Sequence, residues 1–284
     1  MSLDRETIAR AVLQALEEDL GREGDITSEA VIPEEQTARA VIVSRSEGVI
    51  AGVPVAKEVF SRCGARLRAQ VADGDRVSAG QIVAVVGGAL RSILAAERTA
   101  LNFLGRLSGV ATQAARFVEA VGGLAEVRDT RKTTPGLRRL EKYAAEVGGA
   151  RPHRVGLFDG LFIKDNHVAA AGGVAEAIAR ARATRPGVPM IVEVETPADA
   201  LVAAEAGAEE VLLDNMAIEG LKESVALAGG RAHLEASGGV TLENARAIAE
   251  TGVDSLSTGA ITHAAPWLDL ALEVEDDVPL PEEA

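Results

Sequence analysis

Basic residues are concentrated in one stretch of this chain, between Arg128 and Lys164. The sequence of 284 residues has a formal net charge of -14. The basic residues of the stretch nevertheless outnumber its acids, and they are Arg128, Arg131, Lys132, Arg138, Arg139, Lys142, Arg151, Arg154 and Lys164. Guanidinium groups match the paired oxygens of carboxylates and phosphates. The stretch therefore predicts a binding site for a small polyanion.

Polar or glycine residues also lie at the C-terminal end of each predicted strand in the second half of the chain. They are Asp129-Thr130-Arg131-Lys132, Lys164, Glu193, Asp214, Ser237-Gly238-Gly239 and Thr258-Gly259-Ala260. In a parallel barrel the C-terminal ends of the strands meet at one rim, where active sites lie. We therefore expect these groups to gather in a single site.

The side chains at these strand ends suit two kinds of ligand. Arg131, Arg154 and Lys164 are cations suited to carboxylates. Glu193 and Asp214 are suited to a Mg²⁺ ion or to ribose hydroxyls, because hard cations prefer carboxylate oxygens. The predicted site therefore takes a carboxylated molecule together with a sugar and a divalent metal.

Two glycine-containing loops, Ser237–Gly239 and Thr258–Ala260, suit a phosphate group. Glycine lets backbone N–H groups approach an anion closely, and the first loop is expected to precede a helix with its N-cap at Thr241. Paired loops after the last strands are the usual phosphate site of parallel barrels. These loops therefore predict a sugar-phosphate site.

The elements that must position these groups alternate regularly after Gly123. The predicted strands are Leu124–Arg128, Gly160–Lys164, Met190–Glu195, Glu210–Leu213, His233–Ala236 and Ser255–Ser257. Alanine-rich helices are predicted at Val174–Ala183, Pro197–Ala206, Ile218–Leu227 and Leu242–Glu250. This alternation is typical of parallel βα units. There are six or seven units rather than eight, which predicts an open parallel (β/α) barrel.

The first part of the chain has a different pattern. Residues 4–20 show helical periodicity, and 92–121 predict one long helix or two. Between them, short β-branched runs alternate with glycine-rich turns, as in the strands of a barrel-sandwich-like sheet. We therefore predict an α/β protein with an N-terminal α/β domain (1–110) and a barrel catalytic domain (111–265). The tail, 266–284, is expected to pack back on the N-terminal domain.

Composition excludes several classes of protein. A net charge of -14 argues against nucleic-acid or membrane-surface binding, which needs a spread positive field. The single cysteine, Cys63, excludes a disulfide framework and indicates a reducing compartment. No apolar run approaches the ~20 residues of a membrane span, and the N-terminus has no signal-peptide core. A cytoplasmic location is expected.

Seven motifs, taken in order, resemble those of quinolinate phosphoribosyltransferases, the carboxylating nicotinate-nucleotide pyrophosphorylases of NAD biosynthesis. They are Glu18–Thr27, Glu97–Thr112, Asp129–Arg138, Ile163–His167, Val192–Thr196, Leu213–Met216 and Glu235–Gly239. The resemblance extends almost from end to end of the chain. It implies phosphoribosyl transfer from 5-phosphoribosyl 1-diphosphate to quinolinate with loss of CO₂, giving nicotinate mononucleotide. It also implies Mg²⁺ but no organic cofactor.

The resemblance further assigns roles to individual residues. It implies a homodimer in which Arg98 reaches the partner's site, and a quinolinate pocket of Arg131, His153, Arg154 and Lys164. The diphosphate substrate and its metal are assigned to Thr130, Lys132, Glu193, Asp214, Ser237, Gly238, Gly239, Thr258, Gly259 and Ala260. Catalysis is expected to be positioning plus electrostatics, with contributions from Lys132, Lys164, Glu193 and Asp214.

Three other functions fit parts of the sequence. Lys164 at a strand end also suits a Schiff-base aldolase barrel. Residues 71–86 resemble the strand pair of biotinyl and lipoyl carriers, although no lysine follows for attachment. The sequence alone also separates the quinolinate enzyme poorly from a related phosphoribosyltransferase that takes nicotinate or another pyridine acid.

Several assignments stay open at this stage. Arg138, Arg139 and Lys142, with Glu141 and Glu146, are expected to form a solvated helix face. Arg138 and Arg139 are also candidates to touch ligand, and His167 either caps an element or binds. The oligomeric state beyond a dimer is not predicted.

Overall fold

The computed structural model describes residues 3–275, which form two compact units. Of the described residues, unit 1 contains 3–113, Thr134–Gly148 and 265–275. Unit 2 contains Ala114–Thr133 and Gly149–Ala264. Within residues 3–275, no helix has both the length and the apolar character needed to cross a membrane.

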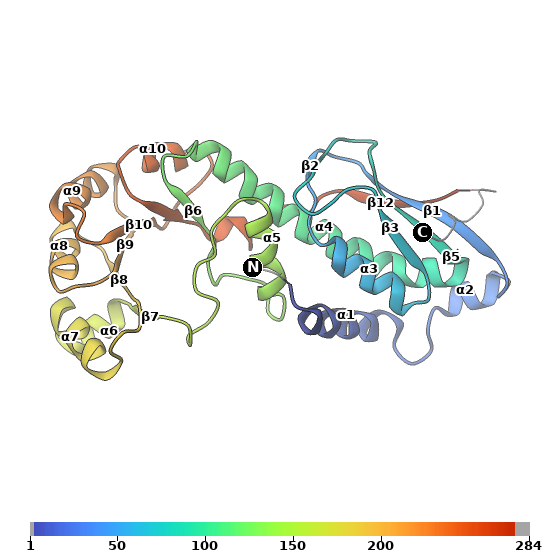
Figure 1. Ribbon diagram of the computed structural model, residues 1–284, viewed down its shortest axis with the longest axis horizontal. Helices are drawn as coiled ribbons and strands as arrows, with labels where there is room; N and C mark the ends of the chain where they lie inside the picture. The colour runs from blue at the N-terminus through green and yellow to red at the C-terminus, as the bar shows by residue number, and fades with distance from the viewer. Residues whose placement is uncertain (1–2, 276–284) are drawn as a thin grey trace. The chain divides into compact units, whose positions relative to one another are not determined.

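Unit 1 is built on a four-stranded antiparallel sheet of order β12-β1-β5-β3 (Figure 1). Its strands are β1 (Thr37–Ser44), β3 (Arg66–Ala69), β5 (Ile82–Ala89) and β12 (Leu270–Glu275). A two-stranded sheet pairs β2 (Gly48–Val49) with β4 (Arg76–Val77). Buried valine, isoleucine and alanine side chains of β1 and β5 form the centre of this sheet, as expected for β-branched residues on a half-buried pleated surface.

Helices complete unit 1. They are α1 (Arg5–Leu20), α2 (Ile26–Val31), α3 (Val53–Arg62), the first part of α4 (Leu90–Val121) and α5 (Arg138–Val147). The helix α1 begins at Asp4, whose carboxylate accepts the backbone N–H of Thr7 at 2.7 Å. The long segment predicted as one helix or two is the single helix α4.

Unit 2 is an open sheet of six parallel strands in the order β6-β11-β10-β9-β8-β7. The strands are β6 (Glu126–Arg128), β7 (Leu161–Ile163), β8 (Met190–Val194), β9 (Glu210–Asp214), β10 (His233–Ser237) and β11 (Ser255–Ser257). Residue Arg151 adds a single parallel bridge to Arg128 at the free edge of β6. The predicted open, six- to seven-stranded parallel barrel is confirmed.

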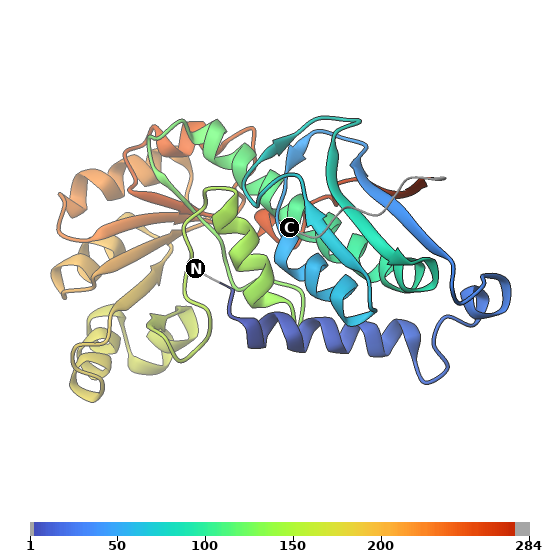
Figure 2. The same ribbon diagram turned by 45° about the vertical axis from the view of Figure 1, so that its right-hand side comes forward.

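Helices line one face of this sheet. Figures 1 and 2 show α7 (Val174–Thr184), α8 (Pro197–Glu205) and α9 (Ile218–Ala228) side by side along it. The short α10 (Ala245–Ala249) contacts β11, and α6 (Asp165–Ala171) contacts α7. Because strand side chains alternate between faces, one face carries buried Val and Leu, and the other face is left for polar side chains.

Several boundaries differ from those predicted. The helix expected at 242–250 is reduced to Ala245–Ala249, and of the β-branched run at 48–53 only Gly48–Val49 forms a strand. The segment 134–148, expected within the barrel domain, belongs to unit 1. There the fully buried carboxylate of Glu141 accepts both Nε and Nη2 of Arg106, at 3.0 and 2.7 Å.

The same contact corrects the solvated helix face expected for α5. Glu141 and Lys142 are both buried, and Glu141 also accepts the backbone N–H of Thr134 at 3.0 Å. Spacing alone cannot show which charged residues of a helix meet a partner from elsewhere in the chain. Of the expected tail, Leu270–Glu275 pairs antiparallel with β1, and 276–284 lie outside the described residues.

Candidate active site

The expected site residues of unit 2 lie at the C-terminal ends of its strands. Cross-strand pairing places Ser257 beside Ser237, and Ser237 beside Asp214. Glu193 pairs with Leu212, two residues before Asp214, so it faces the same side of the sheet. The sheet register therefore brings together groups that are far apart in the sequence, and we call this edge the rim.

Two cations lie over one aromatic ring next to the rim, and a third acts on one of them. The guanidinium carbon of Arg154 lies 4.6 Å from the centre of the Phe162 ring, and Nζ of Lys164 lies 4.4 Å from it. These distances allow cation–π attraction. The pKa of Arg154 is lowered from its ordinary value, first by burial and then by the positive charge of Arg131. Cations held this close together favour an anionic ligand that screens their repulsion.

A buried aspartate places the histidine of this group. Arg151 forms backbone hydrogen bonds with β6, so the chain returns to the edge of this strand just before His153. The buried Asp129 then accepts the backbone N–H of His153 through Oδ1 at 2.8 Å. The His153 ring lies 5.8 Å from that of Phe162, centre to centre. His153 and Arg154 are thus delivered to the cation group by a loop rather than by a strand end.

The two expected metal-binding carboxylates end neighbouring strands. Glu193 on β8 is ion-paired through Oε2 with Nζ of Lys164. Asp214 on β9 accepts the side-chain N–H of Asn215 through Oδ2 at 2.8 Å. Both carboxylates are partly exposed, and in each the second oxygen remains for another ligand. Two half-exposed carboxylates at one sheet edge fit the oxygen preference of Mg²⁺.

The Ser237–Gly239 loop makes a tight turn beside Asn215. Gly238 has a φ of +86°, and a Cβ at this position would lie 2.2 Å from Oδ1 of Asn215. Only glycine meets both conditions without strain. Thr241, however, is not a helix N-cap: Asn244 is the residue before α10, and its Oδ1 accepts the N–H of Thr241 at 2.8 Å. The loop therefore offers its own backbone to an anion, without a long helix behind it.

The Thr258–Ala260 loop lies against Lys132. A Cβ on Gly259 would lie 2.9 Å from Cδ of Lys132. Thr262, just after the loop, donates its hydroxyl to the carbonyl oxygen of Lys132 at 2.6 Å. The hydroxyl of Thr130 accepts the backbone N–H of Lys132 at 3.0 Å. The structure thus joins the first and last rim loops around one exposed lysine.

Four further basic residues singled out in the sequence have other surroundings in the structure. Arg98 is exposed on the part of α4 in unit 1. Arg138 and Arg139 also belong to unit 1, where Arg139 pairs with the exposed Asp4 at 3.3 Å. His167 caps α6, since its Nδ1 accepts the backbone N–H of Lys164 at 3.0 Å. These contacts give His167 a structural role.

A second layer of polar groups, which the sequence did not reveal, lies on the same sheet face. Nη1 of Arg128 donates to Glu210 at 2.6 Å and to Glu235 at 3.0 Å. Nε2 of His233 contacts Nη2 of Arg128 at 3.2 Å and the hydroxyl of Ser255 at 2.8 Å. We call these five residues the floor cluster. The one sign of the floor cluster in the sequence is that charged residues occur inside strands of a parallel sheet, where apolar residues are expected.

Burial raises the pKa of the carboxyl group of Glu235 to about 8, and the negative charge of Glu210 adds to this effect. Glu235 has no exposed surface. One guanidinium therefore faces two carboxyl groups, of which one keeps its proton near neutral pH.

The floor cluster and His153 also approach the arrangement of a metal site, because His153, Glu210 and Glu235 bring their ligand atoms within 4.8 Å of one another. Two features oppose a metal there. The guanidinium of Arg128 already donates to both carboxyl groups. In addition, Nδ1 of His153 accepts the backbone N–H of Arg154 at 2.9 Å, which leaves the ring proton on Nε2, the nitrogen facing Glu235.

Comparison with known proteins agrees with this geometry. The N-terminal domain of quinolinate phosphoribosyl transferase matches residues 25–108, and its C-terminal domain matches residues 110–273. The nicotinate-nucleotide pyrophosphorylase [carboxylating] of Mycobacterium leprae is 46% identical over 280 residues, which cover 95% of this chain and 96% of that protein. The chain belongs to the quinolinate phosphoribosyltransferase family.

Further members of this family show the same similarity. A probable nicotinate-nucleotide pyrophosphorylase [carboxylating] of Bacillus subtilis is 41% identical, with 90% of both chains covered. The crystal structure of NadC from Streptococcus pyogenes superimposes with a TM-score of 0.92 at 39% identity, covering 97% of this chain and all of that one. The family assignment made from the seven motifs is confirmed.

Family membership and geometry together weigh against the other functions considered. The side chain of Lys164 is engaged in an ion pair with Glu193, whereas a Schiff base needs a lysine amine that can attack a carbonyl. The carrier-like segment forms β4 and β5, joined by a turn at residues 78–81 that contains no lysine. Neither rival gains support from the structure.

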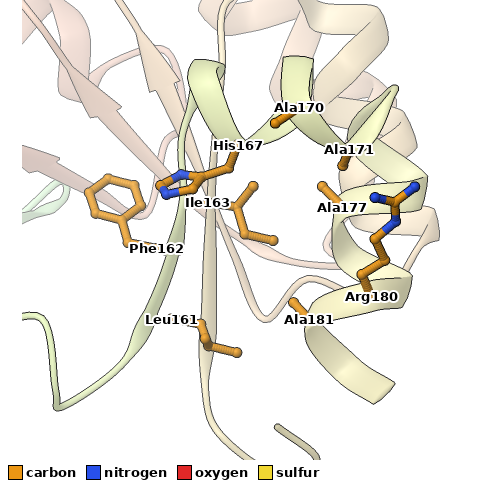
Figure 3. Close-up of a pocket in the computed structure, with 9 residues that line it drawn as sticks. All are labelled: Leu161, Phe162, Ile163, His167, Ala170, Ala171, Ala177, Arg180 and Ala181. Atoms are coloured by element: carbon orange, nitrogen blue, oxygen red, sulfur yellow. The ribbon is translucent and has the colours of Figure 1, made fainter. Parts of the chain in front are cut away.

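A separate cavity of about 370 Å³ lies between β7 and the helices α6 and α7 (Figure 3). Its lining is mostly apolar, and its residues are Leu161, Phe162, Ile163, His167, Ala170, Ala171, Ala177, Arg180 and Ala181. Figure 3 shows the rings of Phe162 and His167 at one end of the cavity and Arg180 on its far wall. The lining contains neither the rim carboxylates nor Arg131 and Arg154, but it shares Phe162 with the cation group.

Proposed function

We propose that this chain transfers the phosphoribosyl group of 5-phosphoribosyl 1-diphosphate to quinolinate, with loss of CO₂, as a step of NAD biosynthesis. The products are nicotinate mononucleotide, diphosphate and CO₂. One observation carries the proposal: Arg154 and Lys164 share the Phe162 ring, and the charge of Arg131 acts on Arg154. A pocket with this charge suits a pyridine that bears two carboxylates.

The cations have two tasks in this reaction. Arg131, Arg154 and Lys164 hold the two carboxylates, so that the ring nitrogen faces the anomeric carbon of the second substrate. Fixing both reactants in this way removes much of the entropic barrier. The nitrogen lone pair forms the new C–N bond as the bond to diphosphate breaks, without an enzyme nucleophile.

Loss of CO₂ follows from the charge that the first step creates. Once the ring nitrogen is quaternary, it stabilises the electron pair left on the ring carbon when the neighbouring carboxylate departs. A proton then takes the place of CO₂ on that carbon. The contribution of the protein is to keep the second carboxylate, the one that stays, bound to its cations during this change.

The leaving diphosphate is assigned to the opposite side of the rim. Lys132 lies against the Thr258–Ala260 loop, and we assign the loops at Ser237 and Gly259 to phosphate oxygens. Glu193 and Asp214 are the residues that would hold Mg²⁺, which when bound neutralises charge on the diphosphate. Preorganised positive charge at a developing anion is a large catalytic term.

An assay of the purified protein with quinolinate, 5-phosphoribosyl 1-diphosphate and Mg²⁺ tests this function, with nicotinate supplied in a parallel reaction. Nicotinate mononucleotide and CO₂ formed in equal amounts from quinolinate alone is the expected result. Product formed from nicotinate, without CO₂, would support the assigned phosphate site but would make nicotinate the acceptor in place of quinolinate. No product from either acid would refute the proposal.

We also propose that the protein is a cytoplasmic homodimer in which Arg98 completes the partner's quinolinate pocket. Arg98 is exposed on α4, and family resemblance supports the role. Inactive Arg98→Ala and Lys164→Ala proteins, mixed and allowed to exchange subunits, should regain about a quarter of wild-type activity if subunits assort at random. Mixing Arg131→Ala with Lys164→Ala is the control, because both changes would disable the same pocket. Recovery no greater than this control would exclude shared sites.

A further inference from the structure

Glu235 lies next to His153, a residue of the predicted quinolinate pocket. Its Oε2 accepts Nη1 of Arg128 at 3.0 Å, and its Oε1 lies 3.6 Å from Nε2 of His153. Among the residues that the structure describes, no hydrogen-bond donor reaches this buried Oε1. Nε2 of His153 therefore faces an acceptor that is deeply buried and still has capacity for a hydrogen bond.

The neighbouring backbone decides which ring nitrogen of His153 carries the proton. The N–H of Arg154 can only donate, and it donates to Nδ1 of His153 at 2.9 Å. A proton on Nδ1 would break this bond and place two N–H groups against each other. The neutral ring, protonated on Nε2, is thus the form that fits both neighbours.

We propose that Glu235 is a positioning residue for the quinolinate pocket: it holds the His153 imidazole neutral and protonated on Nε2, and through that ring it fixes the backbone of Arg154. This inference rests on the proposed function. The distance of 3.6 Å exceeds a hydrogen bond. In ligand-free sites such contacts are often long, and they shorten when the substrate binds.

The protonation of Glu235 matters because of what faces it. Arg128 from β6, Glu210 from β9, Ser257 from β11 and His153 surround its carboxyl group, and His233 on its own strand contacts Arg128. With Glu235 neutral, the charges of Arg128 and Glu210 balance. Ionised Glu235 would add a negative charge beneath a pocket that must bind a dianion.

Two substitutions separate the effect of the Glu235 charge from its effect as a hydrogen-bond acceptor for His153. Glu235→Gln imitates the neutral acid and keeps an oxygen acceptor for His153. It should bind quinolinate within about threefold of wild type at pH 7. Glu235→Leu removes the acceptor. It should raise both Kd and KM for quinolinate about tenfold, because the Nε2–H of His153 loses the buried acceptor that faces it. KM for 5-phosphoribosyl 1-diphosphate should stay within about twofold of wild type. Glu205→Gln, on the exposed side of α8, is the matched control.

The pH profile gives a readout that a merely structural role would not move. In the wild type, kcat/KM for quinolinate should fall above about pH 8, and Glu235→Gln should remove this fall. Nitrogen-15 NMR of histidine, assigned with a His153→Gln variant, should show the Nε2-protonated tautomer at pH 7. This signal and Glu235→Gln keep the test decisive where Glu235→Leu does not fold.

Calorimetric titration with quinolinate alone distinguishes failure of this proposal from failure of the proposed function. Wild type that makes product, with a Glu235→Leu protein that binds quinolinate as wild type does, overturns the positioning role. An alkaline fall that persists unchanged in Glu235→Gln, or an Nδ1-protonated His153, overturns it as well. Wild type that makes no nicotinate mononucleotide from quinolinate refutes the function itself.

Discussion

The rim and the floor cluster are two polar layers on one face of the same sheet, yet their construction differs. Rim groups such as Lys132 and Asp214 are partly or fully exposed, and glycine loops lie beside them. The floor residues Arg128, Glu210 and Glu235 are largely buried and neutralise one another at 2.6 and 3.0 Å. We infer that the rim binds and activates substrates, whereas the floor cluster stabilises the strands and the loop that position the rim groups. Substitutions should therefore act mainly on kinetics at the rim and on stability at the floor, where Glu235 alone is also expected to affect quinolinate binding.

The largest expected effect is at the floor. Arg128→Leu leaves the carboxyl groups of Glu210 and Glu235 without their guanidinium. Removing one member of a buried charge cluster typically destabilises a protein by about 3–5 kcal/mol, which chemical denaturation would measure. Arg180→Leu is the control, because its partner Glu176 and Arg180 itself are both more than half exposed and such pairs contribute about 0–1 kcal/mol. Equal losses in the two variants would show that the floor does not carry stability.

The next effect belongs to the rim. Lys132→Ala should lower kcat by about 10²–10³, the range seen when one preorganised donor to a developing anion is removed. Lys132 is exposed, so the free energy of unfolding should hardly change. Steady-state kinetics and denaturation of the same preparation measure both quantities. A loss of stability that matches the loss of activity would remove the distinction between the two layers.

Weaker effects are expected from the pocket cations taken singly. Arg131→Ala or Arg154→Ala removes a charge-assisted contact, which contributes about 1.5–3 kcal/mol to quinolinate binding. Calorimetry with quinolinate measures this loss. Arg151→Ala is the control from the same loop, since its side chain is 70% exposed. If either pocket variant binds quinolinate as the control does, the pocket is assigned to the wrong residues.

The sequence predicted the rim but not the floor cluster, because the two layers are assembled in different ways. Asp214, Ser237 and Gly259 each follow a strand, so βα periodicity alone placed them at one edge. The floor depends on register instead: Arg128 and Glu210 are 82 positions apart and meet only across the sheet. His153 was assigned from the family resemblance and not from periodicity, because a loop carries it.

Tertiary partners also explain the errors in the predicted elements. Charges on α5 were expected to be solvated because a helical pattern does not show which face meets another element. Arg106, 35 positions earlier, buries Glu141 completely. The predicted N-cap at Thr241 failed because Asn244 captures the backbone N–H of that residue. In both places a specific contact overrode a local preference.

The smallest predicted effect is a pH dependence of stability that belongs to the floor alone. The pKa of Glu235 is about 8 in the folded protein, against an ordinary value of 4.5. Between these values the folded state keeps a proton that the unfolded state has lost. The contribution of Glu235 is therefore most favourable below pH 4.5 and is lost as the pH rises towards 8, by at most about 1.4 kcal/mol per pH unit.

Denaturation at pH 6 and pH 7 measures this slope. The loss of stability should be greater in wild type than in Glu235→Gln, which cannot release a proton. Asp214→Asn, a rim variant, should keep the wild-type slope, because it leaves Glu235 and the other floor residues unchanged. Should the slope of Glu235→Gln equal that of wild type, the proton kept by the folded state would not be on Glu235, and the comparison between the two layers would rest on Arg128 alone.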